Sequence, residues 1–177
     1  MLLVKNAEIY APEYLGKKDL LICGGKIECI QDSIRELPVE CEVLDAEGKI
    51  LTPGFLDQHV HITGGGGEGS FHTRTPELQM SELVENGITT VVGLLGTDGI
   101  TRSVDNLYAK TRVLCEEGVS AYMLTGAYGY PSPTLTGEID RDIVFVKEIL
   151  GVKLAISDHR APNVTEDQLI QIASKAR

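Results

Sequence analysis

Two histidines two positions apart, His59 and His61, are the residues of this sequence with the clearest chemistry. Alternate side chains of an extended strand point to the same face, so both imidazoles can reach one metal ion at about 2.0 to 2.1 Å. The preceding Pro53-Gly54 turn and Asp57 strengthen the pattern. Two incidental polar histidines on a strand are the alternative, which we disfavour because the chain has only four histidines. The sequence therefore predicts His59 and His61 as metal ligands.

Lys153 lies in an otherwise apolar run, Gly-Val-Lys-Leu-Ala-Ile. Lysine is almost never fully buried without a partner. Burial lowers the pKa of an amine, and a neutral amine can take up carbon dioxide to form a carbamate, an anionic oxygen ligand able to bridge two cations. A lysine at a strand end that extends to solvent is the alternative. Beside a histidine pair, we favour Lys153 as a metal ligand.

Composition excludes some classes of partner. The chain has 177 residues, a net charge of −10 and no cluster of Lys and Arg, so a nucleic acid would be repelled. No apolar stretch approaches the roughly 20 residues of a membrane-spanning helix. The four cysteines form no Cys-x-x-Cys pair and the N-terminus has too short an apolar run for a signal peptide, which predicts a reducing, cytoplasmic setting.

The secondary structure that must position these residues is predicted to change near residue 50. Before it, alternating apolar runs flank Gly24-Gly25, which predicts a hairpin in a small antiparallel β domain over residues 1–50. After it, apolar segments suited to parallel strands buried on both faces alternate with helices. The strands are expected at 50–62, 88–96, 119–125 and 151–157.

Helix signals separate these strands. Thr75-Pro76-Glu77 predicts a helix start and Asn86-Gly87 its end, and a second helix is expected from Ser103 to Glu117, closed by Gly118. A third helix is expected at 140–150. The last should begin at Thr165, with Gln168 at capping-box spacing.

Four βα units follow from this count, whereas a (β/α)8 TIM barrel needs eight and typically about 250 residues. We therefore expect residues 51–177 to be the first four βα units of an incomplete barrel and the protein to continue past Arg177. A complete four-stranded open α/β sheet is the alternative. It is less favoured because the first strand ends in metal ligands that need partners from later strands.

The segment Asp45–His61 resembles the first-strand motif of the amidohydrolase superfamily, whose members place metal ligands at the C-terminal ends of barrel strands. Further motifs follow in order: Gly-Gly-Gly-Gly-Glu-Gly-Ser at 64–70, Gly-Thr-Asp-Gly at 96–99, Gly-Ala-Tyr-Gly-Tyr-Pro at 126–131 and Gly-Val-Lys-Leu-Ala-Ile-Ser-Asp-His-Arg at 151–160. With them, the whole chain resembles the N-terminal half of the isoaspartyl dipeptidase family.

The resemblance implies a metallo-dipeptidase that hydrolyses the isopeptide bond of β-aspartyl dipeptides with a hydroxide activated by two divalent cations, with zinc the expected metal. It implies a carbamate on Lys153 formed from CO2. It also implies that the full-length chain is a homo-oligomer. For the substrate, it implies that Glu68 binds the free α-amino group, and that Thr97 and Arg160 hold the carboxylates. Gly66 belongs to the same substrate-binding set, and Tyr128 would donate a hydrogen bond to the scissile carbonyl.

Taken alone, these substrate residues are weaker signals. The glycines at 64–67 can form a flexible loop or let backbone N–H groups approach an anion, and no Gly-Lys-Ser/Thr follows to make a phosphate loop. His72 and His159 are expected at the surface or behind the ligands. Neither stands where the family's two further ligand histidines would be, and its catalytic aspartate is also not found in this sequence.

Three other interpretations of the sequence remain open. A dihydropyrimidinase or hydantoinase shares the histidine pair and the bridging lysine, but hydrolyses cyclic amides and would not need Glu68. The chain could instead be a noncatalytic barrel that serves as a scaffold. It could also be an inactive fragment.

Overall fold

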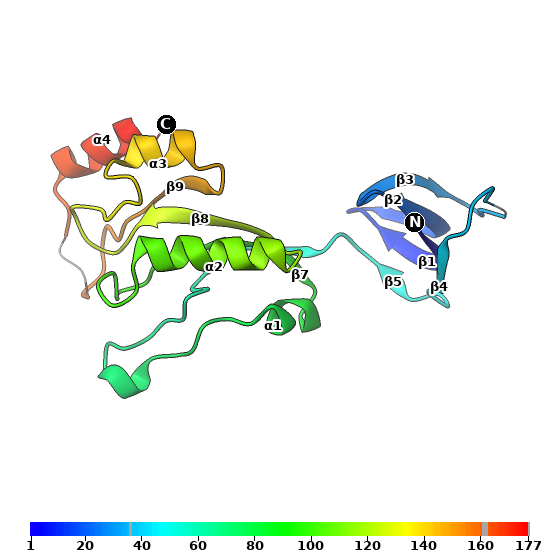
Figure 1. Cartoon of the computed structure of the whole chain (residues 1–177), viewed down its shortest axis with the longest axis horizontal. Helices are drawn as coiled ribbons and strands as arrows, with labels where there is room; N and C mark the ends of the chain where they lie inside the picture. The colour runs from blue at the N-terminus through cyan, green and yellow to red at the C-terminus, as the bar shows by residue number, and fades with distance from the viewer. Residues whose placement is uncertain (36, 161–162, 177) are drawn as a thin grey trace. The chain divides into compact units, whose positions relative to one another are not determined.

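The computed structural model describes residues 1–35, 37–160 and 163–176. Contacts divide the chain into two compact units, Met1–Pro53 and Gly54–Arg177. Figure 1 shows the N-terminal unit in blue to cyan, while the second unit begins in cyan and ends in red. Within the described residues, no helix has both the length and the apolar character needed to cross a membrane.

The first unit is a β-sheet of five strands: β1 (Leu2–Tyr10), β2 (Tyr14–Cys23), β3 (Lys26–Gln31), β4 (Glu42–Asp45) and β5 (Ile50–Leu51). The order is β3-β2-β1-β4, and β5 also pairs with β1. The first three strands are antiparallel, and the predicted Gly24-Gly25 hairpin forms with φ angles of 58° and 76°. Since β4 and β5 run parallel to β1, the complete sheet is mixed.

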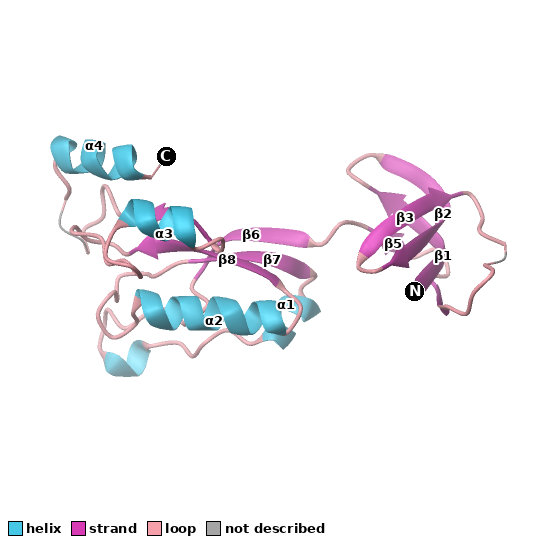
Figure 2. Cartoon of the chain, turned by 45° about the horizontal axis from the view of Figure 1, so that its top comes forward, coloured by secondary structure: helices cyan, strands magenta, loops and turns pink. Residues whose placement is uncertain are grey.

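The second unit has a four-stranded parallel sheet in the order β6-β7-β8-β9. Its strands are β6 (Phe55–Val60), β7 (Ile88–Gly93), β8 (Ser120–Gly126) and β9 (Ile149–Lys153). Its helices are the 3-10 turn η1 (Phe71–Thr73), α1 (Met80–Glu85), α2 (Val104–Glu116), α3 (Ile139–Phe145) and α4 (Glu166–Lys175). Each strand is followed by a helix, as the sequence predicts; Figure 2 shows this parallel sheet and the helices beside it.

Helices cover one face of this sheet. Val91 and Met123 from the strands pack with Leu107 and Leu114 of α2 in a fully buried core. On the other face, Tyr122 of β8 remains 37% exposed. The strands were expected to be buried on both faces, but four strands leave open the face that a closed barrel would turn inward.

Strand boundaries differ from prediction at several places; the strand expected at 88–96, for example, ends at Gly93. The expected strand 50–62 is divided at Pro53-Gly54, and β5 joins the small sheet while β6 begins the parallel one. Proline lacks the N–H that a central strand needs. A Cβ on Gly54 would lie 2.1 Å from Thr89, so only glycine fits at this division. The strand expected at 151–157 instead begins at Ile149 and ends at Lys153.

The observed helix boundaries show which helix ends are determined by local sequence signals. Ser103 caps α2 by accepting a hydrogen bond from the Asn106 backbone, and Thr165 forms the predicted capping box of α4. By contrast, α1 begins at Met80 and not at Thr75-Pro76, because Thr75 is held by the glycine loop described below. The helix expected at 140–150 ends at Phe145, since β9 already begins at Ile149.

Candidate active site

His59 and His61 lie at the carboxyl end of β6, with ring centroids 5.6 Å apart and planes at 83°. Val60, which lies between the histidines, and Ile62, which follows them, pack into the core on the helix side of the sheet. Both imidazoles therefore lie on the opposite face. Nδ1 of His61 is 3.0 Å from the backbone oxygen of Leu94. This hydrogen bond requires a proton on Nδ1 and leaves the Nε2 lone pair free for a metal.

Two glycines make room for the His61 ring. A Cβ on Gly96 would lie 3.1 Å from Cε1 of His61, and one on Gly65 would lie 3.4 Å from Cδ2. Both glycines belong to loops that follow parallel strands. The position of His61 therefore depends on the absence of two side chains as well as on the Leu94 carbonyl.

Lys153 reaches the same face through a bulge in β9. Met123 aligns with Ile149, but the next residue, Leu124, aligns with Gly151, so β9 contains one extra residue. Without the bulge, Lys153 would lie on the same face of the sheet as Ile149, which is buried in the helix-side core. With it, Lys153 aligns with Gly126 and lies on the face that carries the histidines.

Electrostatic effects connect Lys153 with the histidine pair. Burial lowers the pKa of Lys153 below its ordinary value. Burial, followed by the positive charge of Lys153 and the proximity of His61, also lowers the pKa of His59. These shifts favour a neutral imidazole and a less strongly protonated amine, which are the forms that metal binding and carbamate formation require.

The donor set fits a metal, although it is incomplete. Within the described residues, no group of three or more His, Cys, Asp and Glu side chains could hold a metal ion. Lysine is outside that set of residue types, and its carbamate would add the anionic oxygens that His59 and His61 lack. A binuclear centre would still require ligands beyond these three.

The predicted substrate residues converge on a pocket of about 150 Å³ next to His61. Its lining includes Gly66, Glu68, Thr97, Tyr128 and Arg160. Thr97 Oγ1 donates to Glu68 Oε1 at 2.8 Å, and Arg160 Nη1 donates to the same oxygen at 3.2 Å. Hydrogen bonding by Thr97, with a further contribution from Arg160, lowers the pKa of Glu68. The pocket thus holds an anionic and a cationic group in contact.

Asp158 is the neighbour of Arg160 that the sequence interpretation left without a role. Its carboxylate accepts hydrogen bonds from Arg160 Nε and Nη2 at 3.0 and 2.8 Å. This pairing holds the pKa of Asp158 far below its usual range and raises that of Arg160. The signal in the sequence was an acidic residue two positions before an arginine, in the loop that follows β9.

The glycine loop requires glycine at two positions. Gly64 and Gly66 have φ angles of 83° and 70°, and a Cβ on either would come within 2.5 Å of a backbone oxygen, of Thr75 or Thr73 respectively. The loop is closed by a hydrogen bond from Gly65 N to Thr75 Oγ1. The result is a structured loop that leads into Glu68.

Arg102 was not singled out from the sequence, but it supports this loop from behind. It is 4% exposed, and it donates to the backbone oxygens of Thr63 and Thr75 at 3.0 and 3.1 Å. It also pairs with Asp98 at 3.4 Å. The sequence signal was the i,i+4 spacing of Asp98 and Arg102. His72 and His159, by contrast, are exposed.

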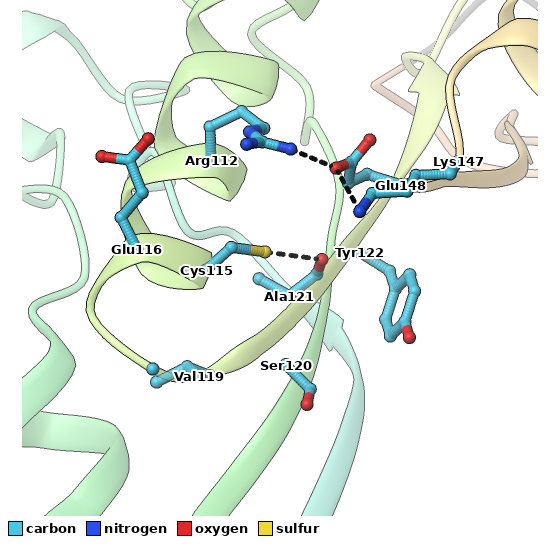
Figure 3. Close-up of a pocket in the computed structure, with 10 residues that line it drawn as sticks. Arg112, Cys115, Glu116, Val119, Ser120, Ala121, Tyr122, Lys147 and Glu148 are labelled. Atoms are coloured by element: carbon cyan, nitrogen blue, oxygen red, sulfur yellow. Dashed lines mark hydrogen bonds and ion pairs between the residues drawn. The ribbon is translucent and has the colours of Figure 1, made fainter. Parts of the chain in front are cut away.

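A larger cavity, of about 450 Å³, lies at the opposite end of β8 (Figure 3). Two basic groups of its lining pair with one carboxylate: Arg112 contacts the buried Glu148 at 2.6 Å, and Lys147 lies 3.9 Å from it. The Cys115 thiol donates to the Ala121 carbonyl. Since the predicted chemistry gathers at the carboxyl ends of the strands, we assign the candidate active site to the smaller pocket.

Comparisons with known proteins find relatives of this chain in both sequence and fold. No family model matches the chain. A dihydroorotase of Listeria monocytogenes is 35% identical over 126 residues, which cover 69% of this chain and 28% of that protein. An L-hydantoinase of Arthrobacter aurescens, at 20% identity and a TM-score of 0.59, shares the fold.

A β-aspartyl dipeptidase from Fervidobacterium islandicum AW-1 is 48% identical, with a TM-score of 0.94 over 98% of this chain and 48% of that one. A second structure of that enzyme, in complex with a β-Asp-Leu dipeptide, gives a TM-score of 0.92. The chain therefore spans about half the length of this relative. The resemblance and the fold class predicted from the sequence are both confirmed.

Proposed function

We propose that this chain, which resembles the isoaspartyl dipeptidase family of the amidohydrolase superfamily over nearly all of its length, is part of a metal-dependent hydrolase that cleaves the isopeptide bond of β-aspartyl dipeptides. One observation carries the proposal. Glu68, Thr97, Tyr128 and Arg160, which come from four separate loops, line one pocket beside His61. An anionic and a cationic group in one small pocket suit a zwitterionic substrate.

In this proposal, His59, His61 and the carbamate of Lys153 would hold two divalent cations, which we expect to be zinc. When bound, the cations would supply Lewis-acid activation of water and of the scissile carbonyl. His61 is oriented for this role by its Nδ1 hydrogen bond to Leu94. The further ligands and the carboxylate that transfers the proton would come from residues outside this sequence.

The substrate roles follow from charge and position. Glu68 would accept hydrogen bonds from the α-ammonium group, while Thr97, Arg160 and the backbone at Gly66 would hold carboxylates. Tyr128 would donate a hydrogen bond to the carbonyl oxygen as negative charge develops there. Water adds to the carbonyl carbon, the C–N bond breaks and the amine leaves with a proton, which yields aspartate and a free amino acid.

We further propose that the small sheet and the βα units form two domains of a cytoplasmic homo-oligomer. Sedimentation of the full-length protein would test the assembly. A monomer at micromolar concentration would contradict it.

The metal role of Lys153 is tested with Lys153→Ala in the full-length protein. We expect loss of bound metal and of activity, with partial recovery when a short carboxylic acid occupies the vacated ligand position. Metal content can be measured by elemental analysis and activity with β-aspartyl-leucine. Lys147→Ala serves as the control, because Lys147 is 85% exposed and lies away from the pocket. Normal metal content in Lys153→Ala would refute the role.

The substrate class is tested by competing assays on the same metal-loaded protein. β-Aspartyl-leucine should be hydrolysed, whereas a hydantoin and dihydroorotate should not. Hydrolysis of a cyclic amide alone would favour the dihydropyrimidinase, hydantoinase or dihydroorotase alternative. Metal-loaded protein that is inactive on all three substrates would favour a noncatalytic scaffold.

A further inference from the structure

We propose that Asp158 is a positioning residue that holds Arg160 in place for both substrate binding and the support of Tyr128. This inference rests on the proposed dipeptidase function, which it deepens at the same site. Asp158 would act entirely through Arg160. It would not itself contact the reacting atoms.

The contact between Asp158 and Arg160 fixes both the position and the plane of the guanidinium group. Nε donates to Oδ1 at 3.0 Å and Nη2 donates to Oδ2 at 2.8 Å, a paired geometry that constrains the plane of the arginine. The backbone N–H of Arg160 also donates to Oδ1 at 2.9 Å. Because this third hydrogen bond restrains the carboxylate, the partner of the guanidinium is itself fixed.

The guanidinium group of Arg160 also contacts two of the proposed substrate-binding residues. Nη2 donates to the Tyr128 hydroxyl at 3.1 Å, and Nη1 makes a single contact with Glu68 at 3.2 Å. The phenol oxygen is the acceptor of this hydrogen bond, so Arg160 helps to fix the position of the Tyr128 hydroxyl. Asp158 thus determines the direction of Tyr128 as well as of the cation that faces Glu68.

The size of the pocket indicates which contact must change. Its volume of about 150 Å³ is below the 300 to 1,000 Å³ of ordinary ligand sites, and two of its lining residues, Glu68 and Arg160, are in contact with each other. A zwitterion can exchange with this contact, since its ammonium can replace Arg160 at Glu68 and its carboxylate can replace Glu68 at Nη1. Only one hydrogen bond of Arg160 is broken, and the paired contact with Asp158 keeps the guanidinium ordered throughout.

The test uses Asp158→Asn and Asp158→Glu in the metal-loaded, full-length protein. The paired contact needs two acceptor oxygens, and Asp158→Asn replaces one of them with an NH2 group that can only donate. We therefore expect kcat/KM for β-aspartyl-leucine to fall about tenfold to a hundredfold. The Asp158→Glu variant retains the carboxylate and should recover part of this loss. Metal content should stay unchanged in both variants.

A double-mutant cycle separates positioning from a general structural role. In an Arg160→Met background, Asp158→Asn should change kcat/KM by less than about twofold, because the group through which Asp158 acts is already absent. An equal loss in the presence and absence of Arg160 would overturn the proposal. Wild-type activity of the Asp158→Asn variant would overturn it as well.

A crystal structure of the Asp158→Asn variant provides a readout that does not depend on activity. The Arg160 guanidinium should leave Glu68 and Tyr128, whereas it should keep both contacts in Asp158→Glu. If the wild-type protein does not hydrolyse the dipeptide, the proposed function fails. The crystal structure then still decides whether Asp158 holds Arg160, and an unmoved guanidinium in Asp158→Asn would refute that.

Discussion

The His61 imidazole shows how closely single residues define this site. Its Nδ1 faces the Leu94 carbonyl, and Gly96 and Gly65 lie against its ring. A carbonyl that fixes the protonated nitrogen orients the other nitrogen toward a metal. Both glycines pack closely against the ring, so a methyl group added at Gly96 would displace the ring or the loop.

We predict that Gly96→Ala weakens metal binding about tenfold or more without unfolding the protein, since disturbed support of a ligand histidine typically costs 10- to 100-fold in affinity. Metal titration by calorimetry, with circular dichroism to monitor folding, measures this. Gly151→Ala is a matched control, because its Cβ would meet Leu124 at an ordinary 3.6 Å. Equal metal affinity in both variants would show that the His61 ring tolerates the methyl group.

A second prediction concerns Glu68. Replacing Glu68 with Gln removes the charge that the α-ammonium would meet, so kcat/KM for β-aspartyl-leucine should fall by about tenfold to a hundredfold. An N-acetylated analogue, which lacks the ammonium, should be affected much less, and metal content should be unchanged. Steady-state kinetics on both substrates measure the difference. Equal losses would mean that Glu68 shapes the loop and does not bind the amine.

At the scale of the elements, Asp142 of α3 connects its helix with β8 and with the loop between them. Its fully buried carboxylate accepts hydrogen bonds from Thr125 Oγ1 at 2.5 Å, from the Leu135 backbone at 2.9 Å and from the Thr136 backbone and hydroxyl at 2.7 Å each. Burial alone would raise the pKa of Asp142, but these hydrogen bonds outweigh it and hold the pKa below its usual value.

This shift predicts acid sensitivity. Since the folded-state pKa of Asp142 is depressed, its ionised form stabilises the protein above the unfolded pKa of about 3.9, and that stability is lost as the pH falls through the lower folded value. Asp142→Asn should therefore lower the unfolding free energy at pH 7 by about 2 kcal/mol or more and should lose less stability than wild type between pH 5 and pH 3. Urea unfolding across this range measures both effects.

The control for this experiment is Asp105→Asn, which changes an exposed carboxylate in the first turn of α2. It should follow the wild-type loss of stability with acid. Parallel curves for wild type and Asp142→Asn would exclude Asp142 as the source of the acid sensitivity.

At the scale of the whole molecule, the second unit exposes surfaces that proteins ordinarily cover. Among the described residues, β6 pairs only with β7 and β9 pairs only with β8, so both edges of the sheet are free. Apolar side chains on its strands are also exposed, including Phe55 at 65%, Leu56 at 55% and Leu150 at 54%. Free edges and apolar surface promote association with other chains.

We therefore predict that a polypeptide of these 177 residues, prepared alone, associates at micromolar concentration. Light scattering after size-exclusion chromatography should give masses well above the 19.2 kDa of one chain. Lysine substitutions at Phe55 and Leu150 should reduce association, whereas a substitution at the exposed loop residue Ile100 should not. A stable monomer would contradict the prediction.

Sequence alone determined the features that depend on a few neighbouring residues. The spacing of His59 and His61 places both rings on one face because a strand repeats every two residues, and Ser103 and Thr165 cap helices through contacts three residues away. The alternation of strands and helices likewise predicted the parallel sheet.

Tertiary structure decided what depends on register and on distant contacts. The bulge at Leu150 sets the face of Lys153, and the start of α1 shifts to Met80 because Thr75 hydrogen-bonds the glycine loop. Glu68 and Arg160 are 92 residues apart in the chain, yet they share one pocket. No local periodicity of the sequence predicts such long-range contacts, because they form only when the packing of strands and loops brings separate segments together.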